Sequence, residues 1–314
     1  MTRPSRGRYG VAAGAIACLL ATTGLTSCSK DRGASPTTTA TSTTTTIPVA
    51  EPPEVLDAGA APRLQLRPTM HAGDQVRLRV ATDVIVHQTV DGRQQRLDTP
   101  PIVQQVALTV TDADDTGYGL RIEIDSVVVN GRDSDLDAER VQALTDQLAP
   151  LAGLVGTSRF DHLGRPIAIE IDAPDGLSDS ARSALSGLRD QLVHLAPALP
   201  EEAVGVGARW TSPIATADGG LDLTGTQTVA ITAIDGDRIS YEVVIDAEAP
   251  AQELSSGDHL TSANATGEGT GWFDLASPAY AVDVTTKGTA TSTREASRVE
   301  QRTQTVVRVT PQDP

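Results

Sequence analysis

Apolar and polar residues alternate along several segments of this chain, which is the pattern of β-strands that bury one face. The first such segment covers residues 76–90, and its apolar positions are Val76, Leu78, Val80, Val84, Val86 and Val90. Asp91-Gly92 follows at once, and this pair suits the positive φ angles of a tight hairpin. The same alternation recurs at 120–124, 239–245 and 299–309. We therefore predict antiparallel strands that each turn one apolar face toward a core.

Two parts of the chain also repeat each other in residue type and spacing. The matching segments are Val106–Asp114 with Tyr118 against Val229–Asp237 with Tyr241, and Gly156–Asp161 against Gly269–Asp274. The first match keeps a constant displacement of 123 positions (229 − 106), and the second contains the only two phenylalanines in the chain. We infer a duplicated unit, with a first β-rich half at 69–200 and a second at 201–314. Similar hairpin composition arising independently is the alternative.

Two amphipathic helices are predicted in the first half, and both apolar stripes are interpreted as core. One helix starts near Ser134, and the other opens with Ser178 as its N-cap and stops before Pro197. Their stripes are Leu136, Val141, Leu144, Leu148 and Leu151, and then Ala181, Leu185, Leu188, Leu192 and Leu195. The second half has no comparable helix, so part of its sheet must pack against the first half, a subunit or a ligand.

The predicted fold class is therefore α+β and mainly β. We expect a duplicated, curved antiparallel sheet, similar to half a barrel, with two helices supplied by the first half. Aromatic residues make up only 3% of the chain, so its core must be built from aliphatic and β-branched side chains.

The first 27 residues have the organisation of an export signal. Arg3, Arg6 and Arg8 precede an apolar stretch at 11–20, which is too short to span about 30 Å of hydrocarbon. Leu25, Thr26, Ser27 and Cys28 follow, and the small residues before the cysteine suit a signal peptidase. A chance cysteine after an ordinary secretory signal is the alternative.

This N-terminus resembles the signal peptide of bacterial lipoproteins, in which Leu25-Thr26-Ser27-Cys28 would be the lipobox. The resemblance implies that Cys28 becomes the acylated first residue and anchors the protein on the outer side of the cell membrane. Each buried methylene contributes about 0.8 kcal/mol and one acyl chain holds only marginally, so stable anchoring needs at least two chains. Cys18 would be lost with the signal, which leaves no partner for a disulfide.

Residues 28–68 are predicted to form a flexible stalk. They contain threonine tracts at 37–39 and 43–46 together with several prolines, and they show no hydrophobic periodicity. Such a segment cannot bury enough apolar surface to offset the entropy of ordering it. Thr-rich stalks of actinobacterial lipoproteins are often O-glycosylated, and the resemblance extends that expectation to this chain.

Charge and motif content argue against several functions. The net charge of −16 falls to about −19 when three signal arginines are removed, and no basic cluster is present, so nucleic acid is not an expected partner. An EF-hand spacing begins at Asp112 and Asp114, but the flanking residues alternate as strands, which favours a hairpin turn. The histidines, which lack metal-ligand spacing, are His71, His87, His162, His194 and His259. We expect no cofactor, no metal and no catalytic residues.

The predicted architecture resembles the unclosed-barrel lipoprotein carriers of bacterial envelopes, which hold acyl chains between a sheet and helices. The chain also resembles an uncharacterised group of bacterial lipoproteins, through Leu199-Pro200-Glu201 and Val206-Gly207-Ala208-Arg209-Trp210. Together these imply a non-catalytic envelope protein that binds or carries a lipid or other hydrophobic molecule. An envelope scaffold that binds another protein is the alternative, and an envelope hydrolase ranks below both.

Trp210 and Trp272 are interpreted as half-buried residues at strand ends rather than as exposed anchors.

Overall fold

The computed structural model describes residues 45–46, 52–131, 136–171, 185, 197–218, 221–254, 257–294 and 297–312. In this part of the chain the strands are β1 (Thr45–Thr46), β2 (Glu54–Asp57), β3 (Gln75–Val90), β4 (Arg93–Asp114), β5 (Gly117–Val129), β6 (Val155–Asp161), β7 (Pro166–Ile171), β8 (Arg209–Asp218), β9 (Leu221–Asp235), β10 (Arg238–Ala249), β11 (Gln252–Glu253), β12 (His259–Asp274), β13 (Tyr280–Arg294) and β14 (Ser297–Gln312). The helix α1 (Ala138–Leu148) runs into the short 3₁₀ helix η4 (Ala149–Leu151).

All of these strands belong to one sheet, in the order β1-β7-β6-β5-β4-β3-β14-β13-β12-β10-β9-β8-β2, with β11 paired to β12. Every pairing between the named strands is antiparallel. The last strand, β14, pairs with β3, so the two halves of the sheet meet along this central ladder. The predicted fold class, mainly β with a curved antiparallel sheet, is confirmed.

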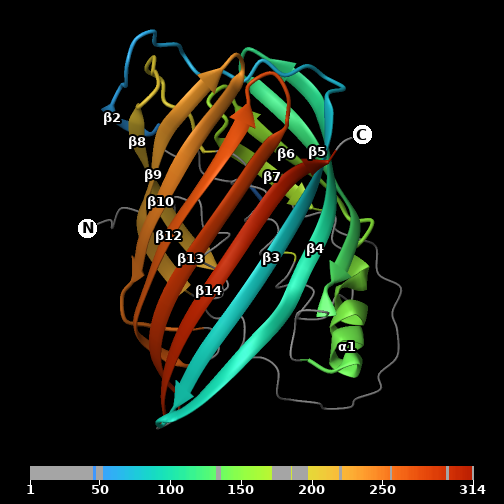
Figure 1. The fold of residues 1–314 in the computed structure, drawn as a ribbon, viewed down its shortest axis with the longest axis vertical. Helices are drawn as coiled ribbons and strands as arrows, with labels where there is room; N and C mark the ends of the chain where they lie inside the picture. The colour runs from blue at the N-terminus through green and yellow to red at the C-terminus, as the bar shows by residue number, and fades with distance from the viewer. Residues whose placement is uncertain are drawn as a thin grey trace, which may run out of the picture.

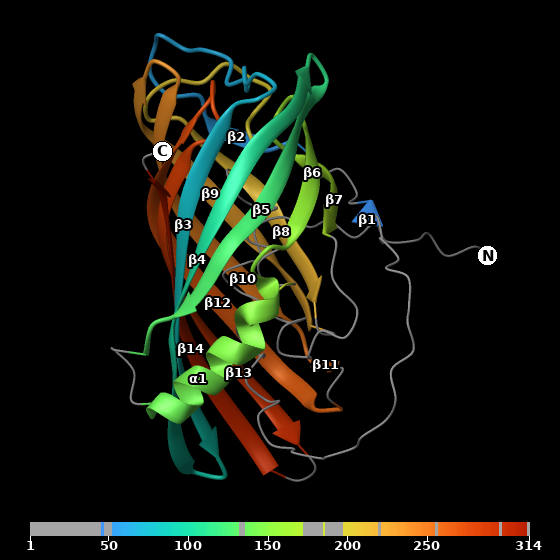
Figure 2. The same ribbon diagram turned by 90° about the vertical axis from the view of Figure 1, so that its right-hand side faces the viewer.

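The sheet curls into a half-barrel that does not close (Figures 1 and 2). The two strands at its edges, β1 and β2, follow each other in the chain. β1 pairs with β7 at one edge, and β2 pairs with β8 at the other. Thr46 and Glu54 are eight positions apart (54 − 46), which limits their separation to about 28 Å. The curvature therefore brings the edges close without joining them by hydrogen bonds.

The strand predictions are confirmed in position and in face. Leu78, Val80 and Val86 are buried on β3, while Arg77 and His87 on its other face are exposed. The predicted hairpin between β3 and β4 has Asp91 at φ 47° and Gly92 at φ 82°, as a turn with two left-handed residues requires.

The helix that was predicted to start near Ser134 begins instead at Ala138. Asp137 is the N-cap, and its carboxylate accepts a hydrogen bond from the Arg140 backbone N–H at 2.9 Å. Leu148 and Leu151 are buried, and Val141 and Leu144 pack against the core, as the stripe predicted. Leu136 precedes the helix.

The second predicted helix, from Ser178 to Leu195, lies outside the described residues except for one position. That position, Leu185, has a helical backbone and is buried in the core.

The predicted stalk ends too late in the chain. β2 is hydrogen-bonded to β8, Leu64 pairs with Val204, and Leu66 is fully buried. Residues 52–68 therefore belong to the folded domain, whereas the rest of the predicted stalk lies outside the described residues except for β1. The prediction missed this segment because single apolar residues separated by prolines and arginines give no periodicity.

Leu66→Ala should lower the free energy of unfolding by about 2–5 kcal/mol, because it leaves a cavity in the core. Denaturant unfolding of the full chain measures the effect. The neighbouring exposed residue provides the control, since Gln65→Ala should change stability by less than about 0.5 kcal/mol. Equal effects of the two substitutions would contradict the assignment of this segment to the core.

Candidate functional site

The concave face of the half-barrel carries small and polar residues over one part of its central strands. The cross-strand register places them in rows: Ala249, Ala263, Ala290 and Gln301; then Ala247, Ala265, Gly288 and Thr303; then Ile245, Gly267, Thr286 and Thr305. All of these residues are buried. We call this set the floor; it spans β10, β12, β13 and β14, and apart from Ile245 it contains no side chain larger than glutamine.

Buried hydroxyl groups in the floor lack hydrogen-bond partners. The Oγ1 atoms of Thr286 and Thr303 are buried and unpaired, although such groups normally cost about 1–3 kcal/mol when left unsatisfied. Gln104 Oε1 on β4 and Ser158 Oγ on β6 are also unpaired, and alternation along these strands places both side chains on the same face as the core. The unpaired buried side-chain oxygens found in the described part of the chain thus all face the inside of the half-barrel.

Large aromatic residues gather at the opposite end of the concave face from the floor. Tyr118 stacks on Phe160 with ring centroids 5.1 Å apart, and Tyr241 lies against Phe273 at 5.8 Å. A Cβ atom at Gly271 would lie 2.7 Å from the Tyr241 hydroxyl oxygen, so only glycine leaves room for this ring. The rings fill this end of the half-barrel with packed side chains.

These two aromatic pairs occupy corresponding positions of the sequence repeat. Their strand registers differ, because Tyr118 is directly opposite Phe160, whereas Phe273 is opposite Ile239, two residues before Tyr241. A shift by two residues keeps the same face inward, so the aromatic contact survives it. The aspartate after each phenylalanine also has one role in both halves: Asp161 accepts from the Leu163 N–H and Asp274 from the Ala276 N–H, each at 2.9 Å.

A small apolar cleft opens beside the aromatic residues. Its volume is about 50 Å³, and its lining includes Tyr118, Phe160, Phe273 and Tyr280. Next to it lies a polar groove of about 410 Å³, which shares Pro68, Met70 and Tyr118 with the cleft. The groove is lined further by charged groups of both signs, Arg67, Asp114 and Asp115, and by His162.

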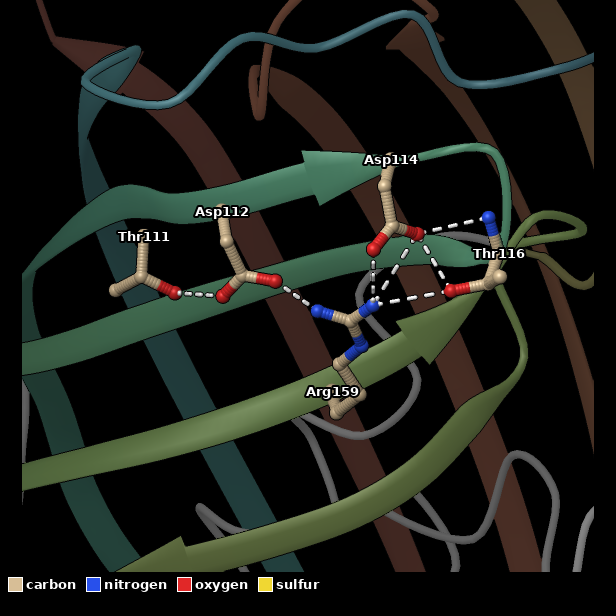
Figure 3. Close-up of polar contacts among 5 residues, drawn as sticks. All are labelled: Thr111, Asp112, Asp114, Thr116 and Arg159. Carbon is tan, nitrogen blue, oxygen red and sulfur yellow. Dashed lines mark hydrogen bonds and ion pairs between the residues drawn. The ribbon is translucent and has the colours of Figure 1, made fainter.

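One arginine organises the polar residues next to this groove (Figure 3). Arg159 on β6 forms ion pairs with Asp112 and Asp114 on β4, and it also contacts the Thr116 hydroxyl at 3.3 Å. The side-chain hydrogen bond from Thr116 holds the pKa of the exposed Asp114 carboxyl below its ordinary value. Exposed ion pairs of this kind contribute little to stability. These pairs connect a side chain of β6 with side chains of the β4–β5 hairpin.

The two aspartates of the apparent EF-hand spacing form ion pairs with Arg159. The predicted hairpin turn at this position is confirmed, since β4 and β5 pair directly across it. Within the described residues, no group of three or more His, Cys, Asp or Glu side chains is placed to hold a metal ion.

The tryptophans are both packed, but to different degrees. Trp210 is fully buried, and its Nε1–H donates to the Ala198 carbonyl at 3.0 Å, so the expected half-burial was wrong for this residue. Trp272 is half-buried as predicted, with the Arg238 guanidinium 4.0 Å from its ring centroid. Neither indole is therefore a free anchor for a partner.

The predicted lipidation residues, Cys28 and the lipobox Leu25, Thr26 and Ser27, lie outside the described residues. Among the helices that the structure does describe, none combines the length and apolarity that a membrane crossing requires.

The floor was not predicted from the sequence. Its signal is the run of glycine, alanine and threonine at alternate positions in 263–271 and 286–290, which gains meaning only once the strand register is known.

Comparison with known proteins assigns no family. No family model matches the chain, and no curated protein matches it. Among solved structures, Ail, the attachment invasion locus protein of Yersinia pestis, aligns over 76% of this chain and 99% of its own length, with 7% identity and a TM-score of 0.16. An outer membrane channel from Pseudomonas putida F1 aligns over 77% and 97%, with 12% identity and a TM-score of 0.19. Scores this low support no argument about fold or function.

The buried tyrosines predict how stability depends on alkaline pH. Burial raises the pKa of Tyr118, Tyr241 and Tyr280 above the ordinary value of 10.0. As the pH rises, the unfolded chain therefore loses these phenolic protons at a lower pH than the folded chain does. The contribution of these groups to the free energy of unfolding should be constant below about pH 10 and should fall above it. Thermal unfolding between pH 8 and 12 measures the fall. Replacing all three by phenylalanine should weaken this dependence, and an unchanged slope would contradict the assignment.

Proposed function

We propose that this chain is a lipid-anchored protein of the bacterial cell envelope whose half-barrel binds a lipid or another hydrophobic molecule on its concave face. The observation that carries the proposal is the floor. A curved sheet normally fills its concave side with interlocking large side chains, since protein interiors are close-packed. Here four neighbouring strands present mainly glycine, alanine and threonine, with Ile245 and Gln301 as the larger side chains, so the side chains of the floor extend only a short distance from the sheet over most of its area.

The size of the floor suits an elongated apolar ligand. Ala263 and Gly267 are four positions apart on β12, which corresponds to about 14 Å along the strand. Beyond Gly267 the strand continues past Gly269 and Gly271 to Phe273, where the large aromatic side chains begin. Larger side chains of the neighbouring strands lie beside these glycines, since an added Cβ would meet Ile245 at Gly267, Val284 at Gly269 and Tyr241 at Gly271. An acyl chain on the floor would therefore contact the small residues of β12 around Ala263 and Ala265.

The anchor and the position at the cell surface form the second part of the proposal, and they are supported by the N-terminal sequence. A charged segment, an apolar stretch and Leu25-Thr26-Ser27-Cys28 occur in the order that lipoprotein signals require. Acyl groups on Cys28 would hold the domain at the membrane, where lipids are available.

Filling the floor should abolish binding without unfolding the protein. Ala265 is fully buried, and Ala265→Leu projects a larger side chain from the middle of the floor. We expect at least a tenfold loss of affinity for the neutral hydrophobic probe N-phenyl-1-naphthylamine, measured by fluorescence titration of the full chain. Thr266→Leu, at the next position on the exposed face, is the matched control and should bind normally.

The same pair of variants separates a ligand site from ordinary packing. If protein side chains filled the space above the floor, Ala265→Leu would destabilise the ligand-free chain by about 1–3 kcal/mol through overpacking. If the space belongs to a ligand, the thermal midpoint of ligand-free Ala265→Leu should match that of the control. Destabilisation together with unchanged probe binding would contradict the proposed site.

The anchor is tested by Cys28→Ala expressed in the native host. We expect the variant to keep its uncleaved signal and to lose metabolic labelling with a radioactive fatty acid. Ser29→Ala is the control and should be labelled and processed normally. Unchanged labelling and processing of Cys28→Ala would overturn the lipoprotein assignment.

A further inference from the structure

We infer that the ligand carries a neutral hydrogen-bond acceptor, an ester carbonyl, and that Thr286 and Thr303 bind it inside the half-barrel. This inference rests on the proposed function and specifies the chemistry of the same site. It starts from the two unpaired hydroxyl groups, whose side chains are 2% and 5% exposed.

The two hydroxyl groups lie close together in the floor. Thr286 on β13 is directly opposite Thr305 on β14, and Thr303 is two residues from Thr305 on the same strand. Diagonal neighbours of this kind have Cβ atoms about 7 Å apart, so one ligand can reach both side chains. Their neighbours include Ala265, Gly267 and Gly288, which offer no side-chain donor or acceptor, and on β14 the polar residues Gln301 and Thr305.

A threonine hydroxyl can donate as well as accept, so by itself it does not fix the ligand group. The floor does limit the charge, because its side chains are all uncharged and burying an unpaired ion costs far more than burying a neutral polar group. A carboxylate or phosphate at this point would need a cation beside it. The ligand group therefore has to be neutral unless the protein supplies such a cation.

The described residues supply none. No lysine or arginine in this part of the chain is buried, and Lys287 and Arg302 project from the exposed face of the sheet. Arg294, at the end of β13, forms a bidentate ion pair with Asp258, at 2.6 Å and 2.8 Å. An ester carbonyl flanked by hydrocarbon satisfies both requirements, since it accepts hydrogen bonds from hydroxyl groups and carries no charge.

The test uses the full chain with Cys28→Ala, so that no acyl anchor competes for the site. Its probes are methyl palmitate, n-octadecane, which has the same chain length without the ester, and palmitate, which is charged at pH 8. We expect methyl palmitate to bind about fivefold more tightly than octadecane for each hydroxyl bond formed, and palmitate to bind more weakly than its ester. The variants Thr286→Val and Thr303→Val keep the side-chain shape and remove the hydroxyl group. The double variant should bind the ester and the alkane equally, whereas Thr285→Val, on the opposite face of β13, should keep the wild-type preference.

A spectroscopic measurement makes the result independent of affinity and stability. In wild-type protein the infrared carbonyl band of ¹³C-labelled methyl palmitate should be shifted to lower frequency by hydrogen bonding, and in the double variant it should return to its position in hydrocarbon. An ester preference or a shifted band that persists in the double variant would overturn this inference but leave the proposed function in place. Palmitate binding as tightly as its ester would do the same. If wild type binds none of the probes, including N-phenyl-1-naphthylamine, both proposals fail.

Discussion

The structure depends on the burial of one face of a single, continuous antiparallel sheet. Each strand satisfies its backbone hydrogen bonds with its neighbours, and alternation turns every second side chain to the inside. Because the strands twist, a sheet of this many strands curls, and its apolar face becomes concave. The rest of the protein has to cover that face or fill it.

Different residues meet this requirement at the two ends of the concave face. At one end the aromatic pairs formed by Tyr118 with Phe160 and by Tyr241 with Phe273 pack across the interior. Toward the other end the strands carry the small residues of the floor. This difference within one face is the reason for assigning a ligand to the floor rather than to the aromatic cleft, whose volume of about 50 Å³ corresponds to one or two water molecules.

Much of the fold could be predicted from local patterns. The strands around Val80, Ile122 and Val307 were located by alternation, and Asp91-Gly92 identified a hairpin, because these signals depend only on neighbouring residues. The sequence repeat aligns Tyr118 with Tyr241 and Phe160 with Phe273, and in the structure each tyrosine contacts the phenylalanine of its own pair. Local patterns failed for Leu66, because contacts with distant strands bury it. The helix start was misplaced for a local reason, since Asp137 caps the helix instead of Ser134.

The site could not be predicted in the same way. Ala265, Gly288 and Thr303 form one row only through the pairing of β12, β13 and β14, and their separation in sequence hides this relation. The sequence indicated that the second half lacks a helical cover and left a subunit, the first half and a ligand as possible partners. The floor with its unpaired hydroxyl groups is the observation on which the proposal of a ligand rests.

The most direct measurement is to identify what the protein holds when it is taken from its own cells. The protein, purified from these cells without detergent, would be extracted with organic solvent and analysed by mass spectrometry. We predict one class of hydrophobic molecule at a stoichiometry near one per chain, and its absence from Ala265→Leu prepared in parallel. Recovery of no such molecule from the wild type, or of equal amounts from both proteins, would contradict a ligand site on the concave face.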